Sequence, residues 1–218
     1  PTEAEALILI KDEEYEDLKN TIDNFNKNIM EEYRVTDKNV SILLEDVHDD
    51  VEEAFSKDTK EKVIYLIMLV PNGVQTMHKE IKGLVETSNN LGIIETKSDA
   101  VVFENAPRSS NPTLKEYILN QFDIIASVLG GESETFGLYP EWQYDPNSYI
   151  RNVFEKVYKE KFGTEAEITA IHAGLECGLF KEKFGNMDMI SFGPDMFGVH
   201  TPKEKLSISS TERTWKLL

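Results

Sequence analysis

The chain has 218 residues, of which 40% are hydrophobic and 29% are charged, and its formal net charge is -17. This size and composition are typical of an ordinary soluble protein with one large domain or two small ones. The negative charge argues against a nucleic-acid backbone or an anionic membrane as a partner, because both would repel the protein.

Cysteine usage and apolar runs indicate the compartment. Cys177 is the single cysteine, so no internal disulfide can form, and a reducing compartment fits. No apolar run approaches the length of a membrane span, and no signal peptide is recognisable, so we expect a cytoplasmic protein. The sequence starts at Pro1, runs almost directly into an apolar segment and ends inside a predicted helix. We therefore expect a piece of a longer polypeptide.

The first part of the chain has the spacing of alternating strands and helices. Apolar runs of strand length occur at residues 4–10 and 40–44, and between them apolar residues from Leu18 to Tyr33 recur at helical spacing. A second helix is predicted over residues 59–70. This helix is apolar on all sides, which indicates burial against another subunit or domain.

A hairpin and a long helix follow. Residues 92–96 and 100–104 read as two strands joined by a tight turn. A helical stripe over residues 114–129 is expected to end at Gly130, where glycine favours termination. The aromatic-rich segment at 134–146 is expected to be extended.

The last third has the pattern β–α–β–α, which is typical of an α/β sheet with crossover helices. A helix from Ile150 to Tyr158 precedes a strand at 166–172 and a buried strand at 187–192. Residues 209–212, "SSTE", have the spacing of a capping box and predict a final helix. The sequence thus indicates an α+β sandwich followed by an α/β segment, with a boundary near Asp145.

His200 is the first candidate functional residue, because it lies on a predicted loop between a strand and a helix. It could be a metal ligand or a loop histidine bonded to a backbone carbonyl. A zinc centre typically needs three protein ligands. The four histidines, His48, His78, His172 and His200, show no close ligand spacing, so the residues alone give no convincing set.

Small residues around Cys177 form the second candidate. Gly174 and Gly178 would let the backbone approach a ligand closely, or they could form a tight turn that opens a helix. Cys177 has no basic neighbour to lower its pKa and reads as a small buried hydrophobe. Glu176 could carry chemistry or favour a helix N-terminus.

Arg108 is the third candidate. It follows a predicted strand in a loop rich in proline and serine. An arginine fork can bind a carboxylate through two parallel hydrogen bonds. The alternative is an arginine that faces solvent.

Five stretches together carry a family resemblance: "IHAGLECGLF", "MDMISFGP", "HTPKEKLSISSTERTW", "VETSNNLG" and "PRSS". They resemble the aminoacyl-histidine (Xaa-His) dipeptidases, relatives of carnosinase among the two-domain zinc peptidases. The resemblance covers essentially the whole chain and is most specific over residues 171–212.

The resemblance implies a fold and a set of roles. Residues 1–145 would be most of an α+β lid, an incomplete ferredoxin-like sandwich through which the enzyme forms a homodimer. Residues 146–218 would be the C-terminal part of the α/β zinc-peptidase catalytic domain, with two zinc ions per subunit. His200 would be the final metal ligand, and the carboxylate of a dipeptide substrate would be bound by Arg108 and the backbone near Gly174. Asn90 would be a weaker polar contact.

The sequence also departs from that family. The N-terminal catalytic segment of the family supplies a His-x-Asp, a bridging Asp, a Glu pair and another Asp, and none of these motifs occurs here. We therefore expect no catalytic residue in this chain, and no activity from the chain alone. The alternative is a self-standing α+β dimerisation or binding module without catalysis. The upstream reading frame distinguishes the two readings.

Overall fold

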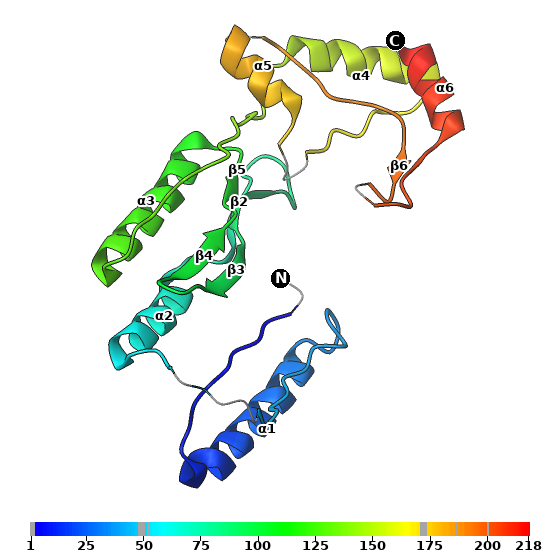
Figure 1. The fold of residues 1–218 in the computed structure, drawn as a ribbon. Coiled ribbons are helices and arrows are strands. Elements are labelled where there is room, and N and C mark those ends of the chain that lie inside the picture. Colours follow the sequence, from blue (N-terminus) through cyan, green and yellow to red (C-terminus); the bar gives the residue numbers. More distant parts are fainter. Residues whose placement is uncertain (1–2, 48–50, 52, 171–173, 186, 200) are drawn as a thin grey trace. The chain divides into compact units, whose positions relative to one another are not determined.

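The fold is described from a computed structural model that covers residues 3–47, 51, 53–170, 174–185, 187–199 and 201–218 (Figure 1). Contacts divide the chain into two compact units, Pro1–Lys62 and Val63–Leu218. The helices are α1 (Tyr15–Glu32), α2 (Lys57–Leu69), α3 (Pro112–Leu129), α4 (Tyr149–Phe162), α5 (Glu176–Phe184) and α6 (Ile208–Leu217), with a short 3-10 helix, η1, at Asp12–Glu14. The strands are β1 (Gly73–Met77), β2 (Val85–Asn89), β3 (Leu91–Thr96), β4 (Val101–Asn105), β5 (Arg108–Ser109), β6 (Met196–Phe197) and β7 (Lys205–Leu206).

In the first unit, the predicted helix is confirmed as α1, but the two predicted strands are wrong. The described residues of this unit contain no β-ladder, and the apolar run at 4–10 is exposed, with Leu9 at 76%. The segment at 40–44 contacts α1 instead, because the backbone N–H of Ile42 donates to Asn26 Oδ1 at 2.8 Å. Apolar content alone therefore did not make a strand where no neighbouring strand supplies hydrogen bonds.

The second unit contains one long antiparallel ladder, which confirms and extends the predicted hairpin. β3 pairs with β4, and β2 pairs with both β1 and β5. Between these pairings, Asn90 and Ala106 exchange two backbone hydrogen bonds, of 3.4 and 2.9 Å. The register of Leu91 with Asn105 thus continues to Ser88 with Arg108. The Asn90–Ala106 pair thus links two sheets, the three-stranded β1–β2–β5 and the two-stranded β3–β4 (Figure 1).

The helices of the second unit begin and end where local chemistry stabilises their ends. Asn111 caps α3 by accepting from the backbone of Thr113 and Leu114, and Ser148 caps α4. Both helices end at a left-handed glycine, Gly130 for α3 and Gly163 for α4, each with φ of 73°. The helices predicted over 114–129 and 150–158 are confirmed.

The strands predicted at 166–172 and 187–192 are wrong for their described residues, which form no ladder. His172 lies outside the described residues. A strand that is buried in a sheet needs a hydrogen-bonded neighbour on at least one edge, and the described residues of this segment have none. The segment instead forms a small pair, β6 with β7. The last helix is confirmed, although its N-cap is Ser207 rather than a residue of "SSTE".

Helix α2 confirms the prediction over 59–70, and its apolar residues are largely exposed within this chain. Ile64, Tyr65, Met68 and Leu69 are between 49% and 77% exposed. None of the described helices combines the length and the apolar character that crossing a membrane requires. The observed architecture is therefore one of small sheets with helices, and the division predicted between residues 145 and 146 stays a prediction.

Candidate functional site

Two predicted substrate residues, Asn90 and Arg108, lie on one face of the ladder. Ser88 pairs with Arg108, and Asn90 pairs with Ala106, so Asn90 and Arg108 are diagonal neighbours on adjacent strands. Side chains two residues apart on a strand point to the same face. Asn90, Ala106 and Arg108 are all exposed on this face. The structure thus brings together two residues that are far apart in sequence.

The opposite face of the ladder is buried and polar. Thr87 and Asn89 are 1% and 2% exposed, and they are the largest fully buried side chains among the described residues. The amide of Asn89 donates to Pro71 O at 2.7 Å and to Asn105 Oδ1 at 2.8 Å, while the hydroxyls of Thr87 and Ser109 lie 2.9 Å apart. These bonds connect β2, β4, β5 and the end of α2, and they hold the register that places Arg108 beside Asn90.

The predicted backbone site at Gly174 lies against the aromatic ring of Tyr139. A Cβ on Gly174 would lie 2.9 Å from Tyr139 Cδ1 and 3.0 Å from Cε1, closer than real Cβ atoms approach other atoms. Gly174 lies two residues before the start of α5 at Glu176, and the tight-turn reading stays a prediction. The predicted contact between the Gly174 backbone and a substrate carboxylate also stays a prediction.

His200 lies outside the described residues, so its predicted role as a metal ligand stays a prediction. The loop around it joins β6 to β7. Gly198 has φ of 63°, and its carbonyl accepts from Thr201 N at 3.1 Å and from Thr201 Oγ1 at 2.7 Å. A side chain at residue 198 would strain this turn, which explains the glycine two residues before His200.

Metal-ligating side chains do not gather in the part of the chain that the structure describes. Among those residues no three His, Cys, Asp or Glu side chains lie where they could hold a metal ion. His78 has a structural role, because its Nδ1 accepts from the backbone of Glu80 and Ile81 at 3.2 and 3.0 Å. His48 and His172, like His200, are outside the described residues. The described residues therefore do not by themselves fit a zinc centre.

Cys177 is half-buried, whereas the sequence predicts a buried residue. Burial is the main cause that raises the pKa of its thiol, and the neighbouring Glu176 raises it further. A thiol with a raised pKa is a poor nucleophile at neutral pH. Glu176 is the first residue of α5, which supports its reading as a residue that favours a helix N-terminus.

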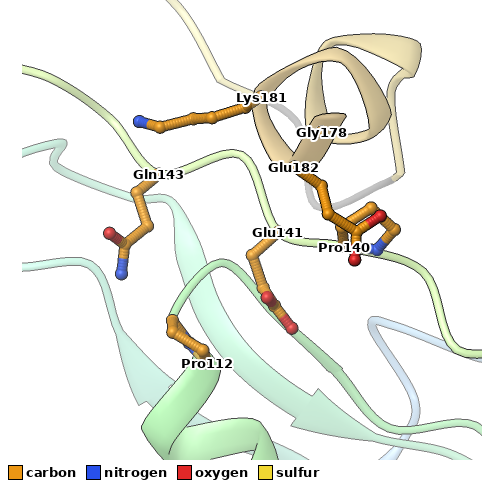
Figure 2. Close-up of a pocket in the computed structure, with 7 residues that line it drawn as sticks. All are labelled: Pro112, Pro140, Glu141, Gln143, Gly178, Lys181 and Glu182. Carbon is orange, nitrogen blue, oxygen red and sulfur yellow. The ribbon is translucent and has the colours of Figure 1, made fainter. Parts of the chain in front are cut away.

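Sequence reasoning missed a pocket of about 240 Å³ between the start of α3, the segment after it and α5 (Figure 2). Its lining residues are Pro112, Pro140, Glu141, Gln143, Gly178, Lys181 and Glu182. Glu141 of this lining forms an ion pair with Lys115 of α3, and these side chains are only 14% and 18% exposed, respectively. Local patterns carry no signal for this pair, because its partners come from distant segments.

Comparison with known proteins identifies relatives of this chain. No family model matches it. It is 34% identical over all 218 residues to the cytosol non-specific dipeptidase of Escherichia coli K12. The crystal structure of an aminoacylhistidine dipeptidase from Vibrio alginolyticus matches 94% of the chain with a TM-score of 0.86 and 32% identity. The aminopeptidase PepT of Bacillus cereus, with 18% identity and a TM-score of 0.53 over 72% of the chain, shares the fold alone.

The chain spans less than half of each of these relatives: 45% of the E. coli dipeptidase, 42% of the V. alginolyticus structure and 43% of PepT. The family resemblance that the sequence motifs indicate is confirmed, since both the sequence relative and the structural relative with substantial identity are dipeptidases.

Proposed function

We propose, from its confirmed resemblance to the aminoacylhistidine dipeptidases, that this chain is part of a metal-dependent dipeptidase that cleaves Xaa-His dipeptides. The observation that carries the proposal is the agreement of two independent matches, 34% identity over all 218 residues and a TM-score of 0.86 over 94% of the chain. Residues 1–145 would belong to the lid and residues 146–218 to the catalytic domain. The name of the E. coli relative, a cytosol enzyme, supports a cytoplasmic location.

Arg108 and Asn90 would bind the substrate. They lie on one exposed face of the ladder, at diagonal positions of adjacent strands. A guanidinium can donate two parallel hydrogen bonds to the carboxylate of a dipeptide, and a neighbouring amide can contact its peptide group. Such a site would favour dipeptides over longer peptides, because a longer peptide has no carboxylate at that distance from the scissile bond.

Zinc enters the proposal through the family resemblance. In the complete enzyme two zinc ions per subunit would activate the attacking water. His200 would be the ligand that this chain contributes, and the other ligands and the acid/base glutamate would come from the N-terminal catalytic segment. The described residues supply no metal site of their own.

Homodimerisation through the lid is also proposed. Support comes from the exposed apolar residues of α2 and of β3, where Ile93 and Ile94 are 50% and 45% exposed. Large exposed apolar patches often mark protein interfaces. Light scattering tests this: a strictly monomeric mass at high concentration would contradict it.

The test of the function uses the complete protein, meaning the product of the whole reading frame that encodes this chain. We expect hydrolysis of Gly-His and carnosine, inhibition by a chelator, and little turnover of the C-terminal amide of Gly-His or of a tripeptide. If the complete protein hydrolyses none of these peptides with zinc or cobalt present, the self-standing binding module becomes the better reading.

A further inference from the structure

The segment after α3 is held on two sides by contacts that local sequence patterns do not predict. The carbonyl of Tyr139 accepts a hydrogen bond from Lys115 Nζ at 2.9 Å, and the same ammonium forms the ion pair with Glu141. On the other side, a Cβ on Gly178 of α5 would lie 2.4 Å from Pro140 O. Figure 2 shows Pro140 and Glu141 between Gly178 and the start of α3 at Pro112. Residues 139–141 are therefore fixed by both α3 and α5.

The fixed segment presents the ring of Tyr139 to Gly174. Three ring carbons, Cδ1, Cε1 and Cγ, lie 2.9, 3.0 and 3.4 Å from the position that a Cβ on Gly174 would occupy. The contact is therefore made by ring carbon atoms, and only glycine leaves room for it. Tyr139 is itself 40% exposed and Gly174 is exposed, so the ring limits where the backbone at Gly174 can lie from one side, by direct contact.

We infer that Tyr139 is a positioning residue for the backbone at Gly174, and that through this contact it sets the affinity for the carboxylate of the dipeptide. The inference rests on the proposed function, in which that backbone helps to bind the substrate carboxylate. Tyr139 touches no substrate in this account. It acts by holding the Gly174 backbone where its hydrogen-bonding groups meet the ligand.

The test compares variants of the complete protein with Gly-His as substrate. Tyr139→Ala removes the ring and should raise KM between about 10- and 100-fold, with kcat changed less than about threefold, because the substrate carboxylate does not react and its binding is lost equally from the ground state and the transition state. Tyr139→Phe keeps every ring carbon that faces Gly174 and should restore the wild-type KM. Gly-His amide, used as a competing ligand, lacks the carboxylate and should bind Tyr139→Ala and wild type alike.

The matched control is Phe136→Ala, on the same segment, where the aromatic side chain is 79% exposed. It should leave both kinetic constants unchanged. An unchanged KM in Tyr139→Ala overturns the inference, as does an equal defect in Tyr139→Phe, or a fall in kcat at constant KM with a lower melting temperature. Absence of turnover by the wild-type protein would instead contradict the proposed function, so the two failures are distinguishable.

Discussion

The ladder over residues 85–109 and the segment over residues 164–206 carry similar strand signals but fold differently. The ladder forms because each strand finds its partner within the same stretch of chain, at Leu91 with Asn105 and Thr87 with Ser109. The later segment has the apolar runs of a buried parallel sheet, but its described residues form only the two-residue pair β6–β7. Parallel strands need partners that are distant in sequence. The comparison shows that an apolar run becomes a strand only where a second strand lies beside it and supplies the hydrogen bonds of the ladder.

The two regions also differ in what they contribute to the proposed site. The ladder places Arg108 beside Asn90, so the substrate contacts proposed for these two residues depend on the register of the strands. The later segment contains Gly174, proposed to bind the substrate carboxylate, and His200, proposed to bind zinc. The other zinc ligands would come from the N-terminal catalytic segment. Substitutions in the two regions should therefore have different consequences.

The largest effect is expected at His200. Replacing it with alanine in the complete protein should lower activity by roughly several orders of magnitude, because one metal ion loses a ligand. The fold should survive, since the sequence predicts a loop at this position. Metal analysis decides the matter: two zinc ions per chain with normal turnover would show that the histidine is structural only.

Arg108→Ala should have the next largest effect. Loss of a charge-assisted pair of hydrogen bonds should lower kcat/KM, and the corresponding rise in activation free energy should be on the order of 2–4 kcal/mol. Zinc content should stay unchanged, because Arg108 is not a ligand in this account. Arg108→Lys should restore little, since lysine lacks the planar fork. Wild-type kinetics for Arg108→Ala would remove this residue from the site.

A stability test examines the ladder register. Asn89→Ala leaves the half-buried acceptors Pro71 O and Asn105 Oδ1 without the amide that donates to them, and it should cost about 1–3 kcal/mol of the free energy of unfolding. Asn90→Ala is the matched control, because the neighbouring side chain is exposed, and it should change stability by less than about 0.5 kcal/mol. Urea unfolding of both variants measures the difference. Equal midpoints would show that the buried amide does not hold the register.

The smallest effect concerns Asp188 in the later segment. The hydroxyl of Ser148 donates to Asp188 Oδ1 at 2.6 Å, and this bond, followed by the backbone N–H of Ile150, lowers the pKa of the carboxyl. A lowered pKa in the folded state means that the contribution to stability is present above the ordinary aspartate pKa, near 3.9, and is lost as the pH falls below it. The melting temperature should therefore differ less between pH 6 and pH 3 in Asp188→Asn than in the wild type. Thermal melts of both proteins at the two pH values measure this. An unchanged pH dependence would contradict the assignment.

Sequence reasoning performed well where the determinants are local. The helical spacing from Leu18 to Tyr33, Gly130 and the turn between β3 and β4 were sufficient to predict α1, the end of α3 and the hairpin. It failed for the apolar runs at 4–10 and 187–192, because hydrophobicity indicates burial but does not name the partner that provides it.

The functional roles of the candidate residues stay predictions. Motifs single out Arg108, Asn90 and Gly174, and the structure adds that the first two share a face of the ladder. Nothing in the local sequence predicts Tyr139 against Gly174 or Lys115 paired with Glu141, because these contacts join segments that only the tertiary structure brings together.

Hydrolysis of Gly-His by two matched preparations tests the central claim most directly. One is the complete protein, and the other is the 218-residue chain, both supplied with zinc or cobalt and freed of contaminating peptidases. The account predicts turnover by the complete protein and none by the chain alone, because the chain would hold substrate-binding residues and one metal ligand but no acid/base glutamate. Turnover of Gly-His by the purified 218-residue chain would contradict it.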